Sequence, residues 1–357
     1  MLLDAESFDL AQRSEDILRS ELHGEFADQV SAELFESLVE FHTPVCASIA
    51  DVQRELYRLR AHALSVASAQ GLRLGSAGTH PFGLFENQRV TRRERYRALV
   101  AELQYAARRE LIFGLHVHVA VDDPDFAVRV LGPLRSHLGE LVALSASSPF
   151  WRGRATGLAS CRHVIFSAFP RSGPPPRFES YEQYATVVGE LVACGCIEDY
   201  TRIWWDVRPH PRFGTVEVRV MDAVSRIEDA VALAAYVQAL VARYRAEYDA
   251  GRALREDHPM LTRENKWRAE RHGLQATVID LHGGGPVPIA RIVENTLRDV
   301  APHARDLGCD RELEGIRRIL RDGNGADRQR AVHASTGDAG AVARDIADIT
   351  RSGLGAQ

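Results

Sequence analysis

Lysine is almost absent from this sequence. Lys266 is the only lysine among 357 residues, so 43 of the 44 basic side chains are arginine. A P-loop needs a lysine for the β- and γ-phosphates, a protein kinase needs its strand lysine, and a pyridoxal enzyme needs a Schiff-base lysine. The residues around Lys266 read ENKWR and fit none of these motifs. The sequence therefore excludes these three classes, and any nucleotide phosphate would have to be bound by arginine and metal ions.

Other absences narrow the choice further. No segment approaches the roughly 18 to 20 uninterrupted apolar residues of a membrane span, and the first residues, MLLDAESFDL, lack the basic start of a signal peptide. The formal net charge is −5 and no dense basic stripe is present, so neither a membrane nor nucleic acid is an expected partner. We expect a cytoplasmic protein.

Cysteine is scarce as well. Five cysteines are scattered along the chain, and only Cys194 and Cys196 lie close together, as C-G-C. An odd number at these spacings indicates neither a disulfide framework nor a zinc site. We expect reduced thiols that mostly pack in the interior.

The hydrophobic pattern predicts helices and strands in irregular alternation. Helical spacing predicts helices over 49–70, 92–112, 125–145, 181–195 and 226–249, the third of them capped by acidic residues before Pro124 and the last preceded by Asp222. The β-type runs are 37–46, 72–76, 112–121, 161–168, 201–207 and 215–221. After about residue 323 we expect a short helix and a loose tail.

Two of the predicted strands carry a polar face. HVHVAV and TVEVRVM alternate polar and apolar residues, so His116 and His118 share one side of a strand, as do Glu217 and Arg219. A structural histidine pair and a half-exposed ion pair are the simple interpretations. The nearby concentration of tryptophan, aspartate and arginine in WWDVRPHPRF favours a sheet that lines a functional cavity, with Glu217 on a cation and Arg219 on a phosphate or carboxylate.

Carboxylates and a tryptophan helix add further candidates. Glu33, Glu36 and Glu40 precede Thr43-Pro44, and Glu40 lies between apolar neighbours, where a buried charge needs a partner such as a metal ion. Magnesium suits scattered carboxylates better than zinc does. The stretch ENKWRAERHGL, residues 264–274, indicates either a packing helix or a stacking surface with phosphate-binding arginines.

Several segments together resemble a known family. GSAGTHPF, GLHVHVAVDDPD, LSASSPFWRGRATGLASCR, WWDVRPHPRFGTVEVRVMD, ENKWRAERHGL and GNGADRQR occur in the order found in carboxylate–amine ligases of the glutamate–cysteine ligase type 2 group. The resemblance spans nearly the whole chain. It implies one catalytic domain over 1–357 of the α+β class, an antiparallel sheet funnel flanked by helices, similar to glutamine synthetase. It also implies an ATP- and Mg-dependent ligase that forms an acyl phosphate and passes the acyl group to an amine, with weak glutamate–cysteine ligase activity and small-molecule substrates.

The resemblance also assigns residues. It implies that Glu40, His116 and Glu217 hold the metal, that Glu217 and Arg219 act on the transferred phosphoryl group, and that Arg162 and His118 contact substrate. Asn265, Trp267 and Arg268 are implied for the nucleotide, and a homodimer is the expected assembly.

Two departures from the family pattern leave alternatives open. Members usually begin with a strand that reads approximately G-V-E-E-E, which we do not find before MLLDAES, and Ser147 stands where asparagine often precedes Ser-Pro-Phe-Trp. A non-catalytic relative that lacks part of the metal site is therefore one alternative. A metal-dependent hydrolase that uses His116, His118, His163 and Asp222 is the other.

Overall fold

The centre of the molecule is a small antiparallel sheet in the order β10–β11–β5. The computed structural model describes residues 1–21 and 24–353. The three central strands are β5 (Gly114–Ala120), β10 (Val207–His210) and β11 (Thr215–Asp222). The register sets Glu217 between Arg208 on β10 and His118 on β5.

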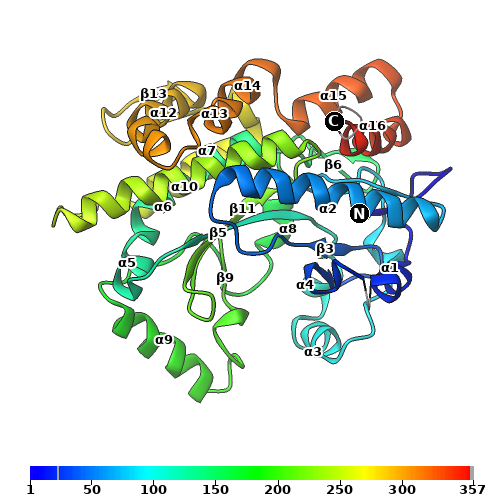
Figure 1. Ribbon diagram of the computed structural model, residues 1–357, viewed down its shortest axis with the longest axis horizontal. Coiled ribbons are helices and arrows are strands. Elements are labelled where there is room, and N and C mark those ends of the chain that lie inside the picture. The colour runs from blue at the N-terminus through cyan, green and yellow to red at the C-terminus, as the bar shows by residue number, and fades with distance from the viewer. Residues whose placement is uncertain (22–23, 354–357) are drawn as a thin grey trace.

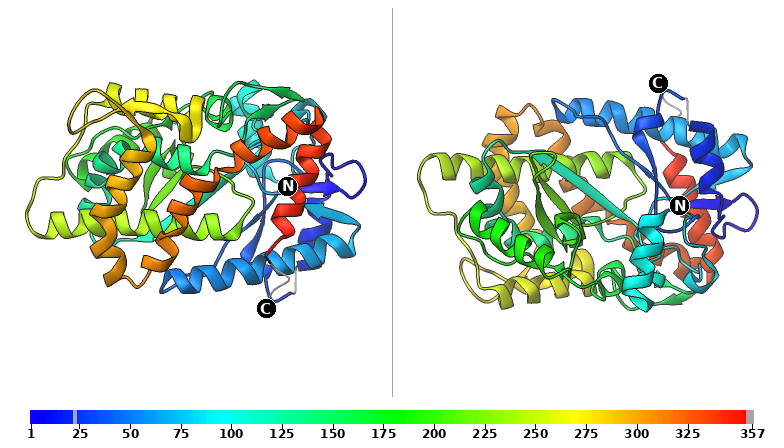
Figure 2. Two further views of the ribbon diagram at one scale, coloured as in Figure 1. Left: turned by 90° about the horizontal axis from the view of Figure 1, so that it is seen from above. Right: turned by 90° about the horizontal axis from the view of Figure 1, so that it is seen from below.

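Helices lie above this sheet and two smaller groups of elements lie below it in Figure 1. The long helices α2 and α10 cross the upper side, with α12 to α16 beyond them (Figures 1 and 2). Below the sheet, β9 and α9 lie on one side and α1, α3 and α4 on the other. The helices are α1 (Ser14–Glu21), α2 (Ile49–Ala69), α3 (Glu94–Leu103), α4 (Tyr105–Arg108), α5 (Pro124–Arg129), α6 (Leu131–Ser136), α7 (Leu138–Ser145), α8 (Arg162–Phe166), α9 (Tyr181–Ala193), α10 (Ile227–Asp249), α11 (Pro259–His272), α12 (Ile289–Asp306), α13 (Asp310–Leu313), α14 (Gly315–Asp322), α15 (Gly325–Thr336) and α16 (Ala339–Arg351).

Short strand pairs and 3₁₀ turns complete the fold. Four of the five short pairs are antiparallel, and the pair of β8 with β9 is parallel. The pairs are β1 (Leu2–Asp4) with β4 (Leu72–Leu74), β2 (Val30–Ala32) with β3 (Val39–Phe41), β6 (Phe150–Trp151) with β7 (Arg154–Ala155), β8 (Ser172–Gly173) with β9 (Trp204–Trp205), and β12 (Thr277–Ile279) with β13 (Pro286–Pro288). The 3₁₀ turns are η1 (Ala27–Gln29), η2 (Phe85–Asn87), η3 (Tyr200–Arg202) and η4 (Gly273–Gln275). The expected α+β class, an antiparallel sheet flanked by helices, is confirmed.

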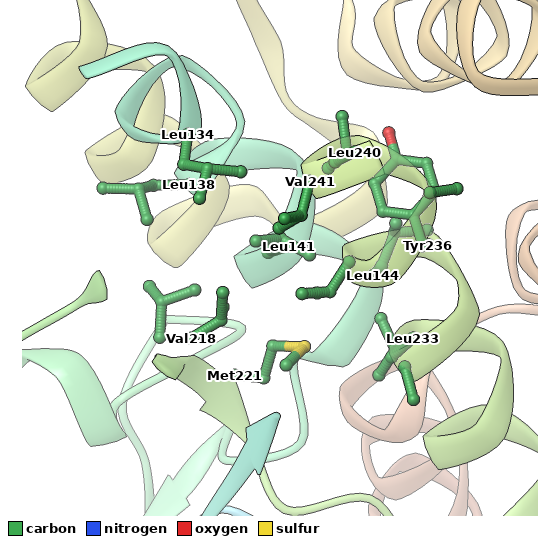
Figure 3. Packing of buried hydrophobic residues seen from close by; sticks show 14 of the residues in the cluster. Leu134, Leu138, Leu141, Leu144, Val218, Met221, Leu233, Tyr236, Leu240 and Val241 are labelled. Carbon is green, nitrogen blue, oxygen red and sulfur yellow. The ribbon is translucent and has the colours of Figure 1, made fainter. Parts of the chain in front are cut away.

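The apolar face of the sheet packs against α7 and α10. Val218 and Met221 of β11 lie below Leu141 and Leu144 of α7, and Leu233 and Tyr236 of α10 complete the cluster (Figure 3). All six side chains are fully buried. Because alternate residues of a strand face opposite sides, this packing directs Glu217 to the other, polar face.

A β-bulge in β11 changes the alternation near its end. Val218 is opposite Val117 and Met221 is opposite Leu115, so one extra residue is inserted on β11. As a result Asp222, opposite Gly114, returns to the side of the sheet that carries Glu217. Regular alternation would have placed these two acids on opposite faces.

Most predicted elements are present, and three predictions are wrong. The predicted helix 92–112 is broken at Gln104, which has φ 48°, and 125–145 forms three short helices. The run 161–168, predicted as a strand, forms helix α8. The C-terminal segment forms two full helices, α15 and α16, and the end of the expected tail, 354–357, lies outside the described residues.

The caps and cysteines follow the sequence in part. Asp123 caps α5 before Pro124 as expected, whereas Arg226, not Asp222, precedes α10 at its N-cap. Of the free cysteines, Cys161 and Cys309 are buried, but Cys194 and Cys196 are exposed, so the packing role expected of most thiols does not apply to this pair. In the described part of the chain no helix has the length and apolar character needed to cross a membrane.

Candidate functional site

The centre of the candidate site is the buried carboxylate of Glu217 on the polar face of the sheet. Its side chain is 2% exposed. Arg208 Nε donates to Oε2 at 2.6 Å, and Arg219 Nη1 donates to Oε1. Burial alone would raise the pKa of Glu217, but the two guanidiniums hold it well below its usual range. Glu217 is therefore a permanently ionised carboxylate between two arginines.

The two histidines of HVHVAV face this carboxylate. Glu217 Oε1 lies 3.8 Å from His116 Nδ1 and 3.6 Å from His118 Nε2. Burial and the neighbouring Arg219 charge lower the pKa of His116, and burial lowers the pKa of His118. Both imidazoles are therefore neutral at neutral pH, as metal or substrate contacts require. His118 Nδ1 also lies 2.9 Å from Thr215 Oγ1, which fixes the ring.

Arg162 closes one end of the polar face. Its guanidinium donates to the carbonyls of Arg219 and Val220, at 3.2 and 3.4 Å, which are the carbonyls of the bulge. Arg162 Nε is buried with no hydrogen-bond partner among the described residues. Gly114 is required beside it, because a Cβ there would lie 2.5 Å from Arg162 Nη2. Arg162 is thus a cation in the site that also stabilises the bulge.

Helix α8 forms, despite its β-type sequence, because tertiary contacts determine its start. Ser148 Oγ accepts the N–H of Arg162, and Ser148 and Ser160 both donate to Asp222. The N–H of Ser147 donates to Asp222 Oδ2 as well. Asp222 is therefore saturated by hydrogen bonds and serves as a structural anchor.

Carboxylates from two other segments contribute to the electrostatic environment of the site. Burial and the nearby Glu40 charge raise the pKa of Glu33, on the β2–β3 hairpin, to about 7. Burial raises the pKa of Glu110, which precedes β5, to about 8, although the charges of Arg162 and Arg109 oppose this shift. Glu36, by contrast, forms an ion pair with Arg89 at 2.7 Å. Sequence reasoning missed Glu110, and its only signal was an acidic residue directly before the polar strand.

The predicted metal ligands are only partly brought together. His116 and Glu217 are neighbours, whereas the side chain of Glu40 accepts a hydrogen bond from Ser31 on its own hairpin. Within residues 1–21 and 24–353, no group of three or more His, Cys, Asp or Glu side chains has the arrangement of a metal site. The set His116, His118, His163 and Asp222 is therefore not gathered as a metal cluster.

The predicted nucleotide residues lie on α11, which packs against α7. Asn265 uses both amide atoms on the backbone of Ile279 in β12, at 2.7 and 2.8 Å. Trp267 is 46% exposed, and Arg268 forms an ion pair with Glu264. Lys266 is buried between Glu270 and Asp206, at 2.8 and 3.3 Å. The only lysine therefore has a structural ion pair, while Trp267 and Arg268 remain accessible.

Comparison with known proteins gives consistent matches. The family model described as glutamate–cysteine ligase family 2 matches residues 1–346. A protein of Rubrobacter xylanophilus with the provisional name glutamate–cysteine ligase 2-1 is 42% identical over 353 residues, covering 99% of this chain and 93% of its own. A protein of Sorangium cellulosum, with the provisional name glutamate–cysteine ligase 2, is 45% identical over 322 residues, covering 90% of this chain and 86% of its own.

A solved structure has the same fold. The glutamate–cysteine ligase of Francisella tularensis, crystallised with AMP, superposes with a TM-score of 0.70 at 14% sequence identity. The match covers 100% of this chain and 88% of the other. This likeness agrees with the expected glutamine synthetase-like fold.

Proposed function

Since the chain belongs to the glutamate–cysteine ligase family 2, we propose that it is an ATP-dependent carboxylate–amine ligase. The carboxylate substrate takes the γ-phosphoryl group of ATP, which gives an acyl phosphate and ADP. A primary amine then attacks the acyl carbon and orthophosphate leaves. Glutamate and cysteine are the first substrates to test, because relatives carry the name glutamate–cysteine ligase.

The observation that carries this proposal is the charge arrangement on the polar face. Arg219 and Arg208 bracket the ionised Glu217, and Arg162 adds a buried cation at one end. A phosphoryl group in transfer carries negative charge on its equatorial oxygens, and preorganised arginines stabilise it without a protein nucleophile. Arg162 Nε and His118 are the proposed contacts for the substrate carboxylate.

Magnesium is the proposed metal, and Glu40, His116 and Glu217 are the proposed ligands. The donor chemistry fits at two points: Glu217 and His116 face each other, and the Glu33–Glu40 pair gathers negative charge that a cation would offset. A bound magnesium ion would neutralise phosphate charge. For the nucleotide we propose Trp267 and Arg268, the accessible residues of α11. A cytoplasmic homodimer remains our expectation for the assembly, and one domain over 1–357 remains the proposed organisation.

Product analysis tests the proposal. Purified protein is incubated with MgATP, glutamate and cysteine, and ADP, orthophosphate and pyrophosphate are quantified separately. Hydroxylamine in place of cysteine traps the acyl phosphate as a hydroxamate. We expect ADP and orthophosphate in equal amounts and a hydroxamate that depends on glutamate.

Other outcomes identify the alternatives. Release of AMP and pyrophosphate would contradict the acyl phosphate route. ATP binding without turnover over a panel of amino acids would favour a non-catalytic relative. Stoichiometric zinc in the purified protein would favour a hydrolase.

A further inference from the structure

Two exposed cysteines lie in the turn that ends α9. Cys194 is the C-cap residue, and the N–H of Cys196 donates to the carbonyl of Leu191 at 2.9 Å. Gly195 between them has φ +68°, the left-handed conformation that ends many helices and that glycine adopts without strain. The turn is thus contracted at Gly195, with one thiol on each side.

This contraction brings the two cysteines within disulfide range. Across one residue in a helical or left-handed conformation, the flanking Cα atoms are about 5.5 Å apart, near the commonest spacing in disulfides. Both thiols are exposed, whereas Cys161 and Cys309 are buried. No heavy atom lies within 4 Å of the point where a Cβ on Gly195 would be, so nothing crowds the inner side of the turn.

We propose that Cys194 and Cys196 form a redox-active dithiol that exchanges with low-molecular-weight disulfides. The thiolate of one cysteine attacks a disulfide R–S–S–R, forms a mixed disulfide and releases one thiolate, which becomes RSH. The second cysteine then attacks the protein sulfur of the mixed disulfide, releases the second RSH and closes the Cys194–Cys196 bond. The protein loses two hydrogen atoms and the small disulfide is reduced to two thiols.

The dithiol is linked to the candidate site by a short segment. Ile197 and Ile203 are buried and anchor this segment. The carbonyls of Thr201 and Ile203 accept hydrogen bonds from Arg208 Nη1, at 3.1 and 2.6 Å. Closing the ring constrains the turn five residues before Thr201, so the position of Arg208 beside Glu217 depends on the state of the pair.

Intact mass and thiol counting test the chemistry without any activity assay. The folded protein is incubated with glutathione disulfide, quenched with acid and measured. We expect a loss of about 2 Da and of two titratable thiols, both reversed by dithiothreitol. The double variant Cys194→Ser/Cys196→Ser should show neither change.

A matched variant and the contrary results complete this test. Cys46→Ser removes a different cysteine and should keep both changes. A stable glutathione adduct without ring closure, or no change in mass, would overturn the proposal. Circular dichroism of each variant establishes that it is folded.

The link to the site rests on the proposed function and is tested by turnover. The oxidised wild-type protein should lose roughly threefold or more of its ligase rate, because small displacements of a positioning group reduce rates steeply. The double serine variant treated with the same oxidant should not. Unchanged turnover in fully oxidised protein would overturn the link. Absence of any ligase activity would overturn the proposed function, while the mass result would still decide the dithiol.

Discussion

Two buried acids five residues apart on β11 have opposite surroundings. Glu217 is bracketed by the guanidiniums of Arg208 and Arg219 and faces two histidines. Asp222 accepts hydrogen bonds from the Ser147 N–H and from two serine hydroxyls. One carboxylate is held by mobile charges whose donors can turn to a ligand, and the other is held by short polar groups that stabilise loops.

The difference shows in the direction of each pKa. The arginines hold the pKa of Glu217 well below its usual range, whereas burial raises the pKa of Asp222 despite the Arg162 charge and the hydrogen bonds. A buried carboxylate kept ionised next to exposed histidines is suited to charged ligands. A saturated carboxylate is suited to support. Burial alone therefore does not separate function from structure, but the partners do.

The largest expected effect concerns the charge pair of the candidate site. Arg219→Ala and Glu217→Gln should each lower turnover on the order of 100-fold, because both act on charge that develops at the phosphoryl group. Steady-state ADP release with a melting curve for each variant measures this. Near-normal turnover, or a loss that follows only from unfolding, would contradict the assignment.

Asp222→Asn should affect stability instead. The amide replaces an acceptor by a donor against Ser147 N–H or a serine hydroxyl, and it removes the charge beside Arg162. We expect a loss on the order of 2 kcal/mol in the free energy of unfolding. Urea unfolding measures it, and Ser160→Ala, which removes one donor only, is the milder control. A normal unfolding curve with abolished turnover would give Asp222 the role that we assign to Glu217.

Glu110 gives a pH-dependent version of the comparison. Its pKa is raised to about 8 in the folded protein from a model value of 4.5, so the folded state binds this proton more tightly than the unfolded state does. Stability from this group is complete below about pH 4.5 and is lost as the pH rises toward 8. Glu110→Gln should remove that loss, so we expect the variant to gain stability over the wild type by roughly 1 to 2 kcal/mol at pH 8 and little at pH 5. Equal differences at both pH values would contradict the raised pKa.

Local sequence patterns predicted the candidate site better than they predicted its surroundings. Alternation in HVHVAV and TVEVRVM placed His116, His118 and Glu217 on one face, because strand geometry fixes which side each residue faces. The bulge that turns Asp222 to the same face depends on pairing with Val117 and Leu115, which the sequence does not display. Helix α8 was predicted as a strand for a related reason, since hydrogen bonds from distant serines override its β-type composition. Glu110 was missed because its pKa depends on burial by other segments.

The smallest expected effect separates structure from ligand binding on α11. Both amide atoms of Asn265 bond to the backbone of Ile279, so Asn265→Ala breaks two hydrogen bonds that hold β12 to the helix. We expect a loss of about 1 to 2 kcal/mol in unfolding free energy and an unchanged dissociation constant for ADP by calorimetry. Trp267→Ala is the matched variant: its ring is 46% exposed, so it should weaken ADP binding with little change in stability. If Asn265→Ala weakened ADP binding at normal stability, the nucleotide would contact Asn265 directly, and the amide would have to leave Ile279 when the nucleotide binds.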